Sequence, residues 1–117
     1  MSWFLVHTKY TSEVFNAMIK KPQDRAKIMS KVVEDSGGKI HMFFYTPGSE
    51  YDAIAIVEAP SFTRLSGFLM VAASTGNYIG FSKVVHLLTP EEGVEAMTIA
   101  GEINDFFGIA LHPPQED

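Results

Sequence analysis

The sequence predicts an α+β fold with the ferredoxin-like order β-α-β-β-α-β and an extra C-terminal helix. The chain has 117 residues, the size of one domain. Its apolar fraction of 46% suits a globular protein with a core, and excludes disorder as a description of the whole chain. Strand-like and helix-like apolar patterns alternate along the chain in that order. We therefore expect a four-stranded antiparallel sheet with two helices on one face.

The first strand is expected over residues 3–8, which are apolar, aromatic and β-branched. Thr11 or Ser12 can then cap a helix, which Pro22 interrupts. A second helical stretch is expected over residues 23–35. The two stretches form either one helix with a proline kink or a short helical turn followed by a longer helix.

Gly37 and Gly38 predict the end of the second helical stretch, because a left-handed cap costs glycine little. Strands are expected over residues 39–46 and 51–58, joined by the turn Pro47-Gly48-Ser49-Glu50. A connection of about four residues makes these two strands a hairpin.

The next helix is expected over residues 62–75, and the fourth strand over 78–88. Thr89-Pro90-Glu91-Glu92 is typical of a helix start, with a capping threonine, proline at the first position and acids in the first turn. We expect this last helix to end near Phe107, at Gly108. The domain then covers residues 1–108, with a loose tail over 109–117.

Both faces of the predicted strands are largely apolar, although a sheet with one wet face should alternate apolar and polar residues. In each strand, one set of side chains is expected on one face and the other set on the opposite face. In the first strand the sets are Trp3, Leu5 and His7, and Phe4, Val6 and Thr8; in the second they are Ile40, Met42 and Phe44, and His41, Phe43 and Tyr45. In the third strand they are Ile54 and Ile56, and Ala53, Ala55 and Val57; in the fourth they are Ile79, Phe81, Val85 and Leu87, and Tyr78, Val84 and His86. Since two helices cover one face, either the last helix or a second subunit must cover the other. Two sheets packed face to face would form a dimeric α+β barrel with a cavity between them.

The chain resembles the GYD domain family over residues 3–98. The resemblance is carried by the segments Gly37-Gly38-Lys39-Ile40, Phe44-Tyr45-Thr46, Tyr51-Asp52-Ala53-Ile54-Ala55-Ile56-Val57-Glu58-Ala59-Pro60 and Ser74-Thr75-Gly76-Asn77. The family takes its name from a Gly-Tyr-Asp tripeptide; this chain keeps Tyr51 and Asp52, with Glu50 before them. The resemblance implies membership of the dimeric α+β barrel proteins, a wider group with cofactor-independent monooxygenases, lactone isomerases and haem-degrading enzymes. It implies no particular reaction.

The amino-acid composition limits the kinds of site and partner that the chain can have. The chain has no cysteine, which excludes a disulfide, a thiolate nucleophile and a cysteine-ligated metal, and suits a reducing compartment. Its net charge of −5 argues against nucleic acid. Five of its nine basic residues fall within residues 20–31. No Lys or Arg follows Lys83, whereas several Asp and Glu residues do. This pattern indicates a solvated helix face and an acidic tail, or a basic face that meets the acidic tail of another chain or an anionic ligand. No signal peptide and no membrane-length apolar run is present, so we expect a cytoplasmic protein that binds no membrane. Because both sheet faces are apolar, we also expect a homodimer or a multiple of it.

The candidate catalytic residues are His7, His41 and Asp52. Histidine can exchange a proton near neutral pH, and Asp52 can act as a general base or instead tie the hairpin turn to a backbone N–H. His7 and His86 are expected on neighbouring strands, near the same end. A histidine pair with Asp52 could hold a metal, but no metal-binding spacing is present and we predict neither a metal nor a cofactor. Glu58 is expected to serve the start of the following helix.

The candidate ligand-binding residues are Trp3, Tyr45, Tyr51 and His86, which would line the barrel cavity. Three functions stay open. The first is an oligomer that binds a small apolar or aromatic molecule without turning it over. The second is a cofactor-independent enzyme of the monooxygenase or isomerase type. The third is a structural or partner-binding module with a filled interior.

Overall fold

The computed structural model describes residues 1–76 and 83–111, with side chains described up to Phe106. The chain divides into two compact units, Met1–Leu87 and Leu88–Asp117. The first unit contains the sheet and three helices. The described part of the second unit contains one long helix.

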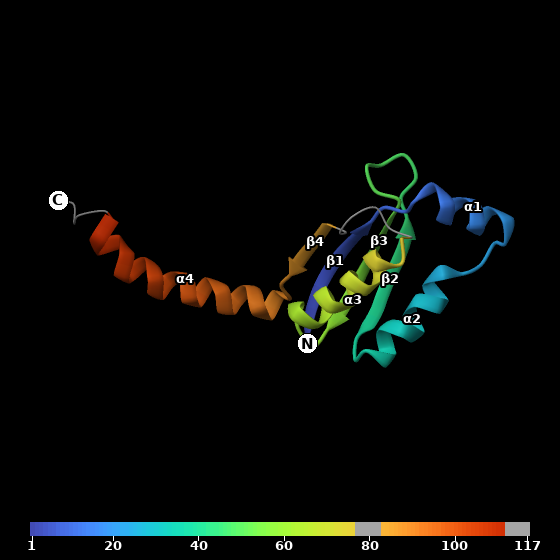
Figure 1. The fold of residues 1–117 in the computed structure, drawn as a ribbon. Helices are drawn as coiled ribbons and strands as arrows, with labels where there is room; N and C mark the ends of the chain where they lie inside the picture. The colour runs from blue at the N-terminus through green and yellow to red at the C-terminus, as the bar shows by residue number, and fades with distance from the viewer. Residues whose placement is uncertain (77–82, 112–117) are drawn as a thin grey trace. The chain divides into compact units, whose positions relative to one another are not determined.

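The sheet has four antiparallel strands, which confirms the predicted fold class (Figure 1). The strands are β1 (Ser2–Thr8), β2 (Lys39–Tyr45), β3 (Ala53–Ala59) and β4 (Lys83–Leu87), in the spatial order β2-β3-β1-β4. β1 and β3 are therefore central, and β2 and β4 are edges. Residues 78–82 of the fourth predicted strand lie outside the described residues.

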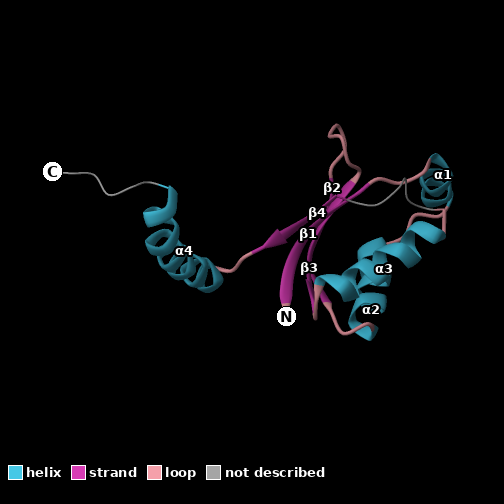
Figure 2. Cartoon of the chain, turned by 60° about the vertical axis from the view of Figure 1, so that its left-hand side comes forward, coloured by secondary structure: helices cyan, strands magenta, loops and turns pink. Residues whose placement is uncertain are grey.

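The helices of the first unit are α1 (Ser12–Lys20), α2 (Arg25–Asp35) and α3 (Phe62–Ser74). All three lie on the same side of the sheet (Figure 2). α2 packs against β2, and α3 packs against β3. The residues around Pro22 separate α1 from α2, so the single kinked helix is wrong. The first element is a helix of 9 residues rather than the short helical turn of the other alternative, and the longer helix, of 11 residues, follows it.

Side-chain caps begin the helices where the sequence predicts them. Thr11 accepts a hydrogen bond from the backbone N–H of Val14, which fixes the start of α1. At the C-terminal end of α2, the N–H of Gly38 donates to the carbonyl of Val33, and Gly37 adopts a φ of +94°. This left-handed geometry is the expected stop signal.

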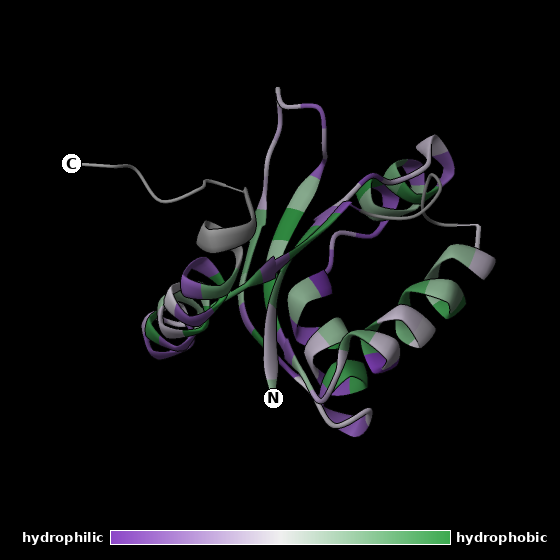
Figure 3. Ribbon diagram, turned by 90° about the vertical axis from the view of Figure 1, so that its left-hand side faces the viewer, coloured by the Kyte–Doolittle hydropathy of each residue, from purple (hydrophilic) through white to green (hydrophobic). Residues whose placement is uncertain are grey.

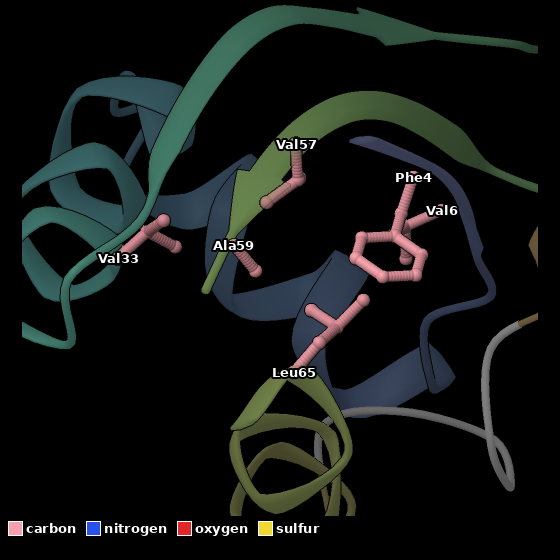
Figure 4. Packing of buried hydrophobic residues seen from close by; sticks show 6 residues of the cluster. All are labelled: Phe4, Val6, Val33, Val57, Ala59 and Leu65. Carbon is pink, nitrogen blue, oxygen red and sulfur yellow. The ribbon is translucent and has the colours of Figure 1, made fainter. Parts of the chain in front are cut away.

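The main core lies between the sheet and the helices. Its buried residues come from β1, β3, α2 and α3 (Figure 4): Phe4, Val6, Val33, Val57, Ala59 and Leu65. Phe4 is completely buried. A second cluster joins Val14 of α1 to Tyr10 and Ala53 at one end of the sheet. Alternate residues of β1 and β3 thus face the helices, as their period of two requires.

The second unit begins with a capping box. The Thr89 hydroxyl accepts from the N–H of Glu92, and the Glu92 carboxylate accepts from the N–H of Thr89. The helix that follows, α4, runs over Pro90–Leu111. The predicted end at Gly108 is therefore wrong. Glycine weakens a helix by about 1 kcal/mol without forbidding it, and helical residues continue beyond it. No helix among the described residues is long and apolar enough to cross a membrane.

Candidate functional site: the open face of the sheet

The face of the sheet opposite the helices is rich in apolar side chains. In the first unit, the three described helices leave this face uncovered (Figure 2). Its apolar residues are Trp3, Leu5, Met42, Phe44, Ile54, Ile56, Val85 and Leu87. Phe44 is 54% exposed and Met42 47% exposed, although both lie inside a strand. Figure 3 shows that strongly hydrophobic segments run through these strands. We refer to this surface as the open face.

A bulge in β2 decides which residues reach the open face. Ile40 pairs with Val57 and Met42 pairs with Ile56, so His41 is an extra residue in the ladder. A bulge shifts the alternation of the side chains by one position. The predicted faces are therefore wrong for Ile40 and His41, which exchange places, and correct for the four residues from Met42 to Tyr45. Ile40 shares the helix-covered face with Phe43 and Tyr45, whereas His41 joins Met42 and Phe44 on the open face.

Trp3, His41 and Glu58 form a polar cluster on the open face. The rings of Trp3 and His41 stack, with centroids 4.2 Å apart and an interplanar angle of 20°. Nε2 of His41 lies 2.9 Å from Oε1 of Glu58. The two side chains of this pair are only 25% and 23% exposed. Glu58 therefore holds the histidine, and the prediction that it serves the start of the next helix is wrong.

The pair leaves one ring nitrogen of His41 for a ligand. An ionised carboxylate can only accept a hydrogen bond, so Nε2 of His41 is the donor. In the neutral ring, Nδ1 is then an acceptor. A carboxylate that fixes the tautomer and orientation of a histidine is the arrangement that general bases use. Sequence patterns missed this cluster, because it depends on the bulge and on cross-strand pairing.

His7 lies further along β1, on the same open face. It pairs with Ile54 of β3 and Lys83 of β4. Its ring lies against the ring of Tyr51, with centroids 4.9 Å apart. His7 and Tyr51 therefore border the open face near its other end.

His86 and Tyr45 lie on the helix-covered face. His86 stacks on Phe4, with ring centroids 4.8 Å apart. Because Phe4 pairs with His86 and His7 pairs with Lys83, the two histidines lie three positions apart along the ladder and on opposite faces. The expectation that they meet near one end is wrong. Tyr45 contacts Phe43 on the helix-covered face, with ring centroids 5.3 Å apart. Of the predicted ligand set, Trp3 and Tyr51 thus lie at the open face, near its opposite ends, whereas Tyr45 and His86 do not lie on it.

Asp52 makes contacts that join the hairpin to the start of the chain. Its Oδ2 accepts a hydrogen bond of 2.9 Å from the backbone N–H of Tyr10. Its own N–H donates to the carbonyl of Thr8, and its carbonyl accepts from the N–H of Thr46. These contacts give Asp52 a structural role in the described chain. No group of three His, Cys, Asp or Glu among the described residues is placed to hold a metal ion.

A small apolar cavity lies on the helix-covered side of the sheet, between the sheet and the helices α2 and α3. Its volume is about 80 Å³. Its lining includes Val6, Tyr10, Phe43, Arg64, Leu65 and Phe68. An apolar cavity of about 150 Å³ is the size that admits a benzene ring. This space has about half that volume.

The chain matches a known protein family. The model of a family described as the GYD domain matches residues 4–97, which covers β1 from Phe4 onward, all of β2, β3 and β4, and the first turns of α4. No curated protein and no solved structure matches the chain.

Proposed function

Because the chain belongs to the GYD domain family, we propose that it acts as a homodimer, or a multiple of one, that binds a small apolar or aromatic molecule between two open faces. In this arrangement the sheets of two copies pack face to face as a dimeric α+β barrel. Trp3, His41 and Glu58 of each copy would lie at the cavity. The protein would work in the cytoplasm, as its lack of cysteine suggests.

The observation that carries the proposal is the exposure of large apolar side chains on the open face of the edge strand β2. Phe44 and Met42 lie beside Ile54 and Ile56 of the neighbouring strand. Contiguous apolar patches of this kind are uncommon on monomers and are typical of interaction surfaces. A second sheet supplies a matching apolar face. Two sheets stacked about 10 Å apart are filled by their own side chains, so a ligand between them requires the sheets to lie further apart at the cavity.

The polar groups of the open face favour a ligand that is flat and carries a hydrogen-bond donor. Trp3 offers an aromatic surface beside His41. Nδ1 of His41 can accept a hydrogen bond from a ligand hydroxyl or N–H group. A mostly apolar site with a few convergent polar groups is the usual composition of a small-molecule pocket.

The His41–Glu58 pair favours a second candidate function, a cofactor-independent enzyme of the monooxygenase or isomerase type. In that case His41 removes a proton from the bound molecule, and Glu58 stabilises the ring in its protonated form. His41→Gln keeps the size and polarity of the side chain but lacks the basic nitrogen. If the protein is an enzyme, the variant loses turnover but binds the molecule within a few-fold of the wild-type affinity. If the protein only binds the molecule, neither the wild type nor the variant turns it over.

Native mass spectrometry of protein purified from its own cells tests the binding function. We expect a dimer, or a multiple of it, with a reproducible added mass. Phe44→Lys places a charge on the open face and should remove both the pairing and the added mass. Met70→Lys is the matched control, since Met70 is 59% exposed on α3. A wild-type dimer without any retained molecule would instead favour a structural or partner-binding module.

A further inference from the structure

The helix α2 carries a stripe of four residues with opposite charges at its two ends. Arg25, Ile28, Val32 and Asp35 have the spacing i, i+3, i+7, i+10, which places them on one face of the helix. Ile28 is 45% exposed, Val32 is 46% exposed, and Asp35 is also exposed. The surface therefore has a positive end, two apolar residues in its middle and a negative end. We call it the α2 stripe.

The two charges of the α2 stripe have no ion-pair partner in the part of the chain that the structure describes. Nε of Arg25 is buried and donates no hydrogen bond to any of these residues. Lys27 and Glu34 are exposed on the other side of α2. Lys31 lies beside the stripe, where its long side chain can extend into water. Both charges of the stripe are thus available to a second molecule.

An open groove adjoins the α2 stripe, between α2 and α3. Arg25 and Val32 line it from α2, and Phe68 and Val71 line it from α3. Val71 is 66% exposed. Both helices lie on the side of the sheet opposite the open face (Figure 2), so the groove is separate from the open face. Because Val32 belongs to both the stripe and the groove, a helix that contacts the stripe can also contact Val71.

The α2 stripe is complementary to a second copy of itself when the two helices run antiparallel. In that direction Arg25 lies opposite Asp35 of the second copy, and Ile28 lies opposite Val32 of the second copy. A two-fold axis repeats each contact, as in any isologous interface. A parallel pair would instead place like charges together at both ends. The alternating spacing of three and four residues is the one that forms the contact seam of paired helices.

We propose that α2 of one copy packs antiparallel against α2 of a second copy, over the groove between α2 and α3. The charges favour this occupant over α4, because residues 88–117 contain no Lys or Arg that could pair with Asp35. The contact uses the helical side of the first unit. It would therefore join the open-face dimers of the proposed function into a multiple of a dimer, and it does not depend on them.

Disulfide cross-linking tests the contact, because the wild-type chain contains no cysteine that would give a background signal. Ile28→Cys and Val32→Cys variants are purified separately, mixed and oxidised mildly. We expect the mixture to form a covalent dimer with one copy of each variant at least about tenfold faster than either variant alone, because antiparallel pairing brings these two positions together. Faster cross-linking of each variant with itself would overturn the proposal, since it would indicate parallel helices.

Lys27→Cys and Glu34→Cys are the matched control pair. These exposed residues lie at nearly the same levels along α2 but on its other side. Their mixture should cross-link at least about tenfold more slowly, because a disulfide needs its two Cα atoms within about 7 Å. Equal rates for the two pairs would overturn the proposal. The absence of a link between Ile28→Cys and Val32→Cys, in proteins that circular dichroism shows to be folded, would also overturn it.

Exchange of the two charges provides a second test. Arg25→Glu, made in both cysteine variants, places a carboxylate opposite Asp35 at each end of the contact and should slow cross-linking at least about tenfold. Arg25→Glu/Asp35→Arg places opposite charges together again and should restore the rate to within about threefold of the original. Both changes suit the helix dipole, so a loss of helix stability would not explain a slower reaction. A double variant as slow as the single variant would overturn the charge match.

Phe44→Lys separates this proposal from the proposed function. The substitution changes the open face alone, so it should lower the mass of the assembly and leave the α2 cross-link intact. A cross-link that disappears in folded Phe44→Lys would overturn the α2 contact as a separate interface. A cross-link that persists while the mass stays that of the wild type would support the α2 contact and contradict the open-face pairing.

Discussion

The carboxylate of Asp52 and the backbone N–H of Tyr10 are 2.9 Å apart, although 42 positions separate them in the sequence. This hydrogen bond connects the β2–β3 hairpin to the segment between β1 and α1. Tyr10 is buried, so its N–H would have little water to replace the carboxylate. The aspartate of the Tyr51-Asp52 motif therefore stabilises the link between two distant segments of the fold.

Removal of that carboxylate should destabilise the first unit. We expect Asp52→Ala to lower the free energy of unfolding by about 1.5–3 kcal/mol, the usual contribution of a hydrogen bond to a charged group. Asp52→Asn, which keeps one acceptor oxygen, should cost less. Urea denaturation measures both. Glu50→Gln is the control, since Glu50 is exposed in the same turn, and it should change stability by less than about 0.5 kcal/mol.

Gly38 should not tolerate a side chain. An added Cβ would lie 2.6 Å from the carbonyl oxygen of Glu58 and 3.2 Å from a methyl group of Val33. Since the nearer atom belongs to the backbone of β3, we expect Gly38→Ala to cost about 1–3 kcal/mol of stability. At Gly67 in α3 an added Cβ meets nothing within 4 Å. Gly67→Ala should therefore raise stability, by about 1 kcal/mol. Thermal unfolding measures both variants. The account would be wrong if the melting temperatures of Gly38→Ala and Gly67→Ala both rose or both fell.

Phe4 should be the residue whose truncation is most costly. It is fully buried and contacts the rings of Phe62 and His86. Phe4→Ala should lower the unfolding free energy by about 3–5 kcal/mol, because it leaves a cavity in the core. Met70→Ala on the exposed side of α3 should cost less than about 0.5 kcal/mol. Similar losses in both variants, measured by chemical denaturation, would contradict the assignment of the core.

The element order could be predicted from the sequence because it depends on local signals. Thr11 and Thr89 begin helices, and Gly37 ends one, through contacts within a few residues of each position. The apolar character of both sheet faces also follows from the residue pattern along the predicted strands, and it led to the expectation that the last helix or a second subunit covers one of them. The end of α4 could not be predicted, because Gly108 is a weak stop signal and the helix continues past it.

The candidate site could be predicted only in part, because its geometry depends on strand pairing. The bulge at His41 reverses the faces of the first residues of β2, and no local sequence pattern identifies it. The partnership of His41 with Glu58 joins residues 17 positions apart on two strands. The register also separates His7 from His86. Such relations depend on tertiary pairing rather than on local propensity.

Sedimentation equilibrium of the wild-type protein and of Phe44→Lys, from nanomolar to micromolar concentration, tests the central claim most directly. Pairing of open faces predicts that the wild type sediments as a dimer, or as a multiple of a dimer, at micromolar concentration. It also predicts that Phe44→Lys stays folded but loses this pairing, while Met70→Lys behaves as wild type. A wild-type protein that is strictly monomeric at micromolar concentration would contradict the claim.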